Sequence, residues 1–158
     1  MGRIDKLWIK PRHRAPVQSR HELHLLAGKG IEGNADAEGS GSSDASGVWR
    51  QVTVISADRW ERVRRELGDV DPSLRRANVM VSGVDLRDSR GKILRLGRAR
   101  IEIRGETRPC TLMDEAHDGL RAALDADWGG GAYGVVMVGG RIRVGDEVSL
   151  ADQSGEVM

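Results

Sequence analysis

The sequence predicts a mostly β protein, with a β-barrel core and a few short helices on its flank. Short apolar segments dominate the chain, 21 glycines punctuate it, and only two segments have helical spacing. Many short strands with few helices are typical of a barrel. A chain of 158 residues can bury a core of its own. We therefore expect a single domain over residues 1–158, with its core at about 20–150.

The predicted strands are short runs in which apolar residues alternate with polar ones or follow one another, bounded by turn residues. The clearest is 48–55, in which Val52 and Ile55 point to opposite faces. Gly145 and Asp146 interrupt the last segment and predict a tight turn or a bulge there. The predicted strands are 4–9, 22–26, 48–55, 79–81, 93–96, 99–104, 107–112, 134–138 and 141–150.

One helix is predicted directly after the strand at 48–55. Ser56 is a suitable N-cap, and Gly68 suits the C-terminal end. A second, shorter helix is predicted at 119–126. The apolar face of the first helix carries Trp60, Val63 and Leu67, and its arginines, Arg59, Arg62, Arg64 and Arg65, are expected on the solvated face.

The charges of the chain are almost balanced. The 25 basic and 24 acidic residues give a net charge of +1, which argues against general binding to nucleic acid. The sequence contains no apolar run long enough to cross a bilayer and no signal-peptide pattern at its start. A single cysteine suits a reducing compartment. We expect a cytoplasmic protein that does not bind membranes.

Two segments are predicted to lack regular structure. Residues 34–47 consist mainly of glycine, serine, alanine and aspartate, which cannot bury enough apolar surface to order a loop. We expect this segment to be a flexible loop, either a lid or simply disordered. Residues 151–158 are expected to form a frayed tail.

The only cysteine, Cys110, directly follows Pro109. Pro109 fixes its own φ and favours an extended backbone at Arg108, so Cys110 is expected at the end of a strand or in a stiffened loop. The charge of Arg108 favours the thiolate, the form that attacks electrophiles and ligates soft metals. The alternative is a cysteine that packs as a small apolar residue.

Three polar side chains, Arg75, Arg76 and Asn78, come just before the predicted strand at 79–81. They are suited to binding an anion, because the guanidinium fork matches the geometry of phosphate oxygens. The alternative is a solvated turn without a ligand. The residues alone leave both interpretations open.

Several short motifs follow one another in a distinctive order. They are Gly30-Ile31-Glu32-Gly33, Arg50-Gln51-Val52-Thr53-Val54-Ile55-Ser56, Leu74-Arg75-Arg76-Ala77-Asn78-Val79, Ser82-Gly83-Val84-Asp85-Leu86, Pro109-Cys110 and Gly139-Gly140-Arg141-Ile142-Arg143-Val144-Gly145-Asp146-Glu147-Val148. In this order they resemble the MOSC domain family, the domain found at the C-terminus of molybdenum cofactor sulfurases. The resemblance covers about residues 20–150, nearly the whole chain.

The resemblance implies a β-rich barrel that binds a molybdopterin-type molybdenum cofactor, and it does not imply pyridoxal phosphate. In the better understood relatives the cysteine ligates molybdenum, and some of them reduce N-hydroxylated compounds. In the sulfurases a related domain handles sulfur destined for the metal. On this chain the resemblance implies Cys110 as the metal ligand and catalytic residue. It implies that the cofactor, through its phosphate or its pterin, is bound by Arg50, Arg75, Arg76, Asn78 and Arg108.

A reductase of this kind takes a small-molecule substrate. It would receive electrons from separate electron-transfer proteins, because one cysteine cannot hold an iron–sulfur cluster. Two alternatives use the same thiol. One is a carrier of sulfur, as a persulfide on Cys110, or of the molybdenum cofactor. The other is a thiol hydrolase with His117 as its base.

The chain departs from the family pattern at one point. The family often continues Gly-Ile-Glu-Gly with an aspartate and a histidine before another glycine. Here the continuation is Asn34-Ala35-Asp36-Ala37-Glu38-Gly39. An amide therefore stands at Asn34 where a carboxylate is usual, and the histidine is absent.

Overall fold

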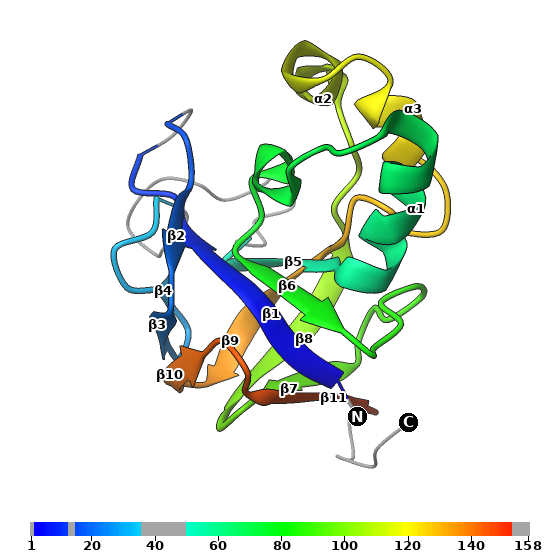
Figure 1. Ribbon diagram of the computed structural model, residues 1–158. Coiled ribbons are helices and arrows are strands. Elements are labelled where there is room, and N and C mark those ends of the chain that lie inside the picture. The colour runs from blue at the N-terminus through cyan, green and yellow to red at the C-terminus, as the bar shows by residue number, and fades with distance from the viewer. Residues whose placement is uncertain (1, 13–14, 36–49, 153–158) are drawn as a thin grey trace.

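A computed structural model describes residues 2–12, 15–35 and 50–152, and seven of its strands close into a barrel (Figure 1). Strand β1 pairs with both β6 and β11, which closes the ring. All neighbours in the ring are antiparallel except β5 and β6, which run parallel. Around the barrel the strands are β1 (Gly2–Ile9), β11 (Glu147–Ala151), β7 (Ile93–Leu96), β8 (Ala99–Glu106), β9 (Ala132–Val138), β5 (Val52–Ser56) and β6 (Val79–Ser82). The predicted fold class is confirmed.

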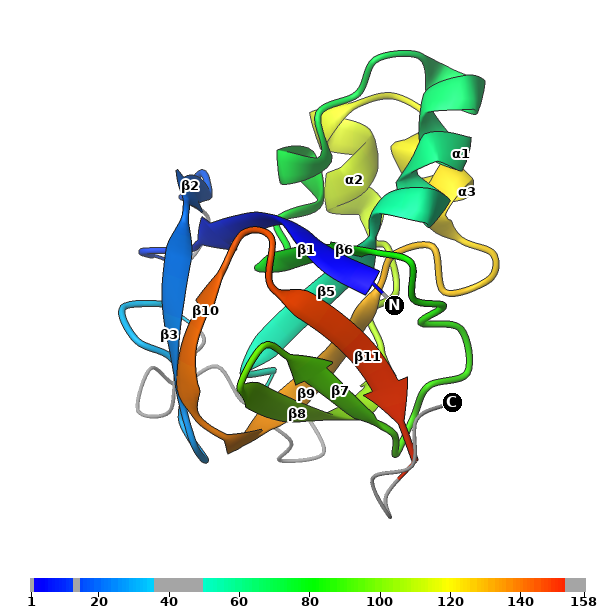
Figure 2. The ribbon, with the colours of Figure 1, turned by 60° about the horizontal axis from the view of Figure 1, so that its bottom comes forward.

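Four short strands lie beside the barrel (Figure 2). Strand β2 (Gln18–Arg20) pairs with β1, while β3 (Glu22–Leu26) lies between β10 (Gly140–Arg143) and β4 (Gly30–Ile31) in a small sheet of its own. The predicted strand at 141–150 is thus two strands, β10 and β11. They are separated by the expected turn, in which Gly145 has a φ of 95°.

Strand β5 contributes to two apolar clusters at once. Val52 and Val54 point into the barrel, whose interior is filled by aliphatic side chains from every strand of the ring. Ile55 points outward into a second cluster formed with the helices. The predicted alternation is therefore correct, but both faces of the strand are buried because helices cover the outer one. The strand begins at Val52, and the first two residues of the predicted segment, 48–49, lie outside the described residues.

The predicted first helix is confirmed as α1 (Ala57–Leu67). The Ser56 hydroxyl accepts a hydrogen bond of 3.1 Å from the backbone N–H of Arg59, and Gly68 ends the helix with a φ of 89°. Trp60 is buried against the outer face of the barrel, and its indole N–H donates to the carbonyl of Val70 at 3.0 Å. Serine at the N-cap and glycine after the last turn thus define the helix as the sequence predicts.

The expectation that the arginines of α1 form its solvated face is wrong for Arg59, which is half-buried, whereas Arg62 is exposed and still finds a partner. Arg59 donates to the carbonyls of Ala123 and Ala126 at 2.7 and 3.2 Å. Arg62 donates to the carboxylate of Asp127 at 3.0 Å. These residues are one turn apart, so α1 holds the segment that leads from α3 to β9.

Three short helices complete the fold, and α1, α2 and α3 gather on one side of the barrel (Figures 1 and 2). They are the 3₁₀ turn η1 (Pro72–Arg75), α2 (Thr111–Ala116) and α3 (Leu120–Leu124), the last within the predicted helix at 119–126. The predicted strand at 107–112 is wrong. Strand β8 ends at Glu106, and Cys110 occupies the N-cap position of α2. Pro109 lacks an N–H group and cannot extend the pairing beyond this point.

Several expectations concern residues that the structure does not describe. Of the predicted flexible loop at 34–47, only Asn34 and Ala35 are described, and residues 153–158 of the predicted tail lie outside the described part. Within the described ranges, no helix combines the length and apolar character that a bilayer crossing requires.

Asn78 links β1, β5 and β6 beneath the helices. Its side chain is fully buried, and its carbonyl oxygen accepts from the N–H and the hydroxyl of Thr53 at 3.0 and 3.1 Å. Its amide donates to the carbonyl of Trp8 at 3.3 Å and to Asn34 Oδ1 at 3.2 Å. Asn34 Oδ1 also accepts from the backbone N–H of Lys10 at 2.7 Å. A buried amide therefore satisfies backbone groups that the strand ladders leave free.

Replacing this amide should cost much of the stability of the fold. We expect Asn78→Ala to lower the free energy of unfolding by about 3 kcal/mol, because it leaves buried donors and acceptors without partners. Urea denaturation measures this change. Arg108→Ala, at a side chain that is 84% exposed, is the control and should change stability by less than about 0.5 kcal/mol. A loss below about 1 kcal/mol for Asn78→Ala would contradict the role given to the amide.

Candidate functional site

A pocket of about 270 Å³ lies where the end of β1, the start of β5, η1 and the start of α2 meet. Its wall contains Cys110 together with four basic residues, Lys10, Arg50, Arg75 and Arg76. Among the described residues that line it, none carries a carboxylate. Four of the six predicted site residues therefore come together, although they are far apart in the sequence.

Arg75 forms the buried wall of the pocket. Its side chain is 8% exposed, and its Nε and Nη2 atoms donate to the carbonyls of Gly130 and Thr107 at 2.9 and 3.0 Å. Its Nη1 atom lies 3.8 Å from the sulfur of Met113. Burial lowers the pKa of Arg75 to about 10, and interaction with Cys110 acts in the opposite direction. The guanidinium thus stays charged at neutral pH while its described partners are neutral.

Arg76 and Arg50 bring two more charges to the pocket. Arg76 ends η1 in the left-handed region, with a φ of 64°, and its side chain donates to the carbonyl of Ala15. The guanidinium of Arg50 lies 4.8 Å from the centre of the Tyr133 ring, a cation–π distance. The left-handed turn at Arg76 follows directly on Arg75, and of these two consecutive arginines one is buried and the next is half-buried, both in the pocket lining.

Cys110 is exposed and free. Its backbone is extended, with φ −124° and ψ −179°, and α2 begins at the next residue. The expected stiff loop after Pro109 is thus present, and the alternative of a buried packing cysteine is wrong. Leu112, also in the pocket wall, is 53% exposed. A thiol with an open side and an apolar neighbour is accessible to a ligand from solvent.

Two predicted residues lie outside the pocket lining. Asn78 is the buried link described above, behind Thr53, which does line the pocket. The side chain of Arg108 is 84% exposed and pairs with Glu106 at 3.8 Å. Proline at the next position favours an extended backbone at Arg108, and Arg108 is not among the residues that line the pocket.

Lys10 and Thr107 belong to the pocket but were not predicted from the sequence. Lys10 directly follows β1, and no local sequence pattern marks it as a pocket residue. Thr107 is 7% exposed, and its hydroxyl has no hydrogen-bond partner among the described groups. A buried hydroxyl without a partner in a pocket wall is a position where a ligand atom can complete a hydrogen bond.

His117 does not support the hydrolase alternative. It follows the last residue of α2, its Nδ1 atom lies 3.0 Å from the carbonyl of Asp118, and it does not line the pocket. The six residues of α2 separate it from Cys110 by about 9 Å along the helix axis. A base must come within hydrogen-bond reach of the thiol it activates.

Comparison with known proteins identifies the fold and the family. The family model of the MOSC domain matches residues 42–149. No curated protein matches the chain. The YuaD protein from Bacillus subtilis is 22% identical, with a TM-score of 0.78, and the match covers 94% of each chain. YiiM from Geobacillus stearothermophilus is 14% identical, with a TM-score of 0.73 over 97% of this chain and 76% of that one. YiiM from Escherichia coli is 17% identical, with a TM-score of 0.67 over 99% and 73%.

These structural likenesses show a shared fold. The family model spans the barrel from β5 to β11 and includes both η1 and Cys110. Because it matches well over half of the residues, the chain belongs to the MOSC domain family, whose members are associated with the molybdenum cofactor.

Proposed function

We propose that the pocket binds a molybdopterin-type molybdenum cofactor, that Cys110 ligates the molybdenum, and that the protein reduces N-hydroxylated compounds. The main support is the excess of positive charge around the only cysteine. Arg50, Arg75 and Arg76 line the pocket beside Cys110, and no described residue of the lining carries a carboxylate. An anionic group with phosphate oxygens would compensate this charge.

The described residues fit the cofactor in two further respects. Arg75 is held by neutral carbonyls, so its buried charge gains stability from an anion in the pocket. The unpartnered hydroxyl of Thr107 can form a hydrogen bond to an oxygen or a pterin nitrogen at the same wall. Arg76 lines the same pocket and adds a second guanidinium that can donate to phosphate oxygens.

The chain itself supplies binding, charge and one ligand. Thiolate sulfur is a soft donor that suits a metal already held by sulfur. When bound, the cofactor would supply two-electron redox chemistry. Reduction of an N-hydroxylated compound consumes two electrons and two protons and gives the amine and water. In this proposal separate electron-transfer proteins deliver the electrons, and solvent at the open side of Cys110 delivers the protons.

A second function uses the same pocket without turnover. The exposure of Cys110 also favours a carrier that holds a persulfide or passes on the cofactor. A persulfide on Cys110 adds one sulfur atom to the protein, whereas a molybdenum ligand does not. Mass spectrometry of the intact chain therefore distinguishes the two functions.

Arg76→Ala should weaken retention of the cofactor while leaving the thiol intact. Loss of one charge-assisted hydrogen bond to phosphate corresponds to roughly tenfold weaker binding. The measurement is the molybdenum content per protein after gel filtration, for protein produced in a cofactor-competent host. Arg65→Ala removes an exposed arginine of α1 outside the pocket and is the matched control. Equal molybdenum content in Arg76→Ala and in the wild type would argue against a phosphate site at η1.

Cys110→Ser should alter the metal itself. Serine offers a harder oxygen that ionises poorly near neutral pH, so one sulfur ligand should be lost. X-ray absorption at the molybdenum edge should show this loss, and reduction of an N-hydroxylated substrate should stop. Part of the cofactor should remain, because the basic residues are unchanged.

The same variant separates the competing functions. A carrier would show sulfur loading on Cys110 in the wild type and no reductase activity with any electron donor. Identical molybdenum content and an identical metal spectrum in wild type and Cys110→Ser would rule out Cys110 as the ligand.

A further inference from the structure

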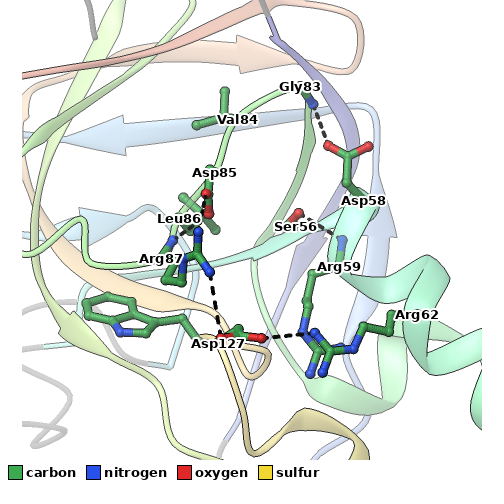
Figure 3. A pocket seen from close by; sticks show the side chains of 11 residues that line it. Ser56, Asp58, Arg59, Arg62, Gly83, Val84, Asp85, Leu86, Arg87 and Asp127 are labelled. Atoms are coloured by element: carbon green, nitrogen blue, oxygen red, sulfur yellow. Dashed lines mark hydrogen bonds and ion pairs between the residues drawn. The ribbon is translucent and has the colours of Figure 1, made fainter.

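The pocket lined by Cys110, Arg75 and Arg76 is called the anion pocket below. The segment between α3 and β9 connects it to a second pocket beside α1. That second pocket has a volume of about 510 Å³ and is drawn in Figure 3. In this segment Asp127 and Trp128 both have left-handed backbones, with φ values of 57° and 58°. Two consecutive non-glycine residues in this region persist only where their surroundings hold them.

The side chain of Asp127 supplies one such hold. Its carboxylate accepts from Arg62 at 3.0 Å and lies 3.8 Å from Arg87, so it bridges α1 and the loop after β6 (Figure 3). The hydrogen bond from Arg62 lowers the pKa of Asp127 below that of an ordinary aspartate, so the carboxylate stays ionised to lower pH. Arg62 also lies 3.9 Å from Glu66, so it has another partner when Asp127 is changed.

Three residues further on, the same segment supports the anion pocket. The carbonyl of Gly130 accepts from Arg75 Nε at 2.9 Å. The carbonyl of Gly131 accepts from the N–H of Thr107 at 2.9 Å, and the carbonyl of Thr107 accepts from Arg75 Nη2. Both carbonyls that fix the guanidinium of Arg75 therefore depend on where this segment runs.

The connection between Asp127 and Gly130 is short and closely packed. The N–H groups of Gly129 and Gly131 donate to the carbonyls of Ala126 and Trp128 at 3.0 and 2.9 Å. A Cβ atom on Gly129, Gly130 or Gly131 would lie 2.5, 2.2 or 2.1 Å from a backbone oxygen. The close packing leaves the chain few alternative paths between Asp127 and Gly130.

We propose that Asp127 is a positioning residue for the anion pocket: its ion pairs with Arg62 and Arg87 hold the carbonyl of Gly130 in place, and this carbonyl aims the guanidinium of Arg75. The inference rests on the proposed anion binding by Arg75. It adds that the orientation of the Arg75 guanidinium depends on ion pairs of Asp127 that lie outside the anion pocket. Asp127 does not line the anion pocket, and it acts on Arg75 only through the backbone.

The experiment compares Asp127→Asn with Asp58→Asn in the full chain. Asp58 lines the same second pocket, and its carboxylate accepts from the N–H of Gly83 at 2.8 Å, a hydrogen bond that the amide oxygen of asparagine can keep. Both variants remove one negative charge and keep the side-chain shape. Two quantities are measured: hydrogen exchange of the Arg75 Nε–H by NMR, identified through its absence in Arg75→Lys, and the Kd for inorganic phosphate.

Asp127→Asn should speed exchange of the Arg75 Nε–H and raise the phosphate Kd about three- to tenfold, while Asp58→Asn leaves both as in the wild type. Arg62→Gln should have the same effect as Asp127→Asn, and the double variant should be no worse than either single one. Unchanged exchange in Asp127→Asn, or equal effects of Asp127→Asn and Asp58→Asn, would overturn the inference. A different result would show that the anion site itself does not exist: the phosphate Kd would then be unchanged in Arg75→Ala. In that case the exchange of the Arg75 Nε–H still tests whether Asp127 positions this side chain.

Discussion

The burial of one guanidinium, that of Arg75, organises the site. A charge that is 92% buried is stable only when its donors have partners, and Arg75 finds them on backbone carbonyls from two segments, before α2 and before β9. Thr107 and Gly130 belong to these two segments and both line the pocket. The hydrogen bonds from Arg75 therefore connect two walls of the pocket. The described partners are neutral, which leaves the charge available to an anion. The same group thus stabilises the fold and defines the electrostatics of the pocket.

Much of the fold could be predicted because local signals agree with it. Ser56 and Gly68 mark the ends of α1, and the Gly145 turn separates β10 from β11. The prediction of a strand at 107–112 was wrong. The pattern of this segment resembles a strand, but β8 ends at Glu106, Pro109 cannot extend the pairing, and a helix follows. Arg59 was misjudged because helical spacing shows only which face of a helix carries charge. It does not show that carbonyls of α3 and a carboxylate meet that face.

The candidate site could be predicted only in part, and the reason is topological. Arg75, Arg76 and Cys110 lie in local sequence contexts that suggest anion binding or thiol chemistry. Lys10 carries no such signal, because its place in the pocket depends on the path of β1 around the barrel. Asn78 resembles Arg75 in sequence context, yet the chain turns at Arg76, and the amide then points into the barrel wall and bonds Thr53. Side-chain direction after a left-handed residue is a property of the folded backbone.

The closure of the barrel by β1 and β11 also has a consequence for the order of events during synthesis. Gly2 pairs with Val148, so the ring cannot close until the residues up to Val148 have emerged from the ribosome. Lys10 continues from β1, whereas Cys110 and Gly130 emerge later, so the basic pocket cannot be complete before residue 130 has emerged. Nascent chains would therefore hold dispersed, solvated cations with weak affinity for anions. High affinity would appear together with the native state, and bound ligand would in turn stabilise that state by mass action.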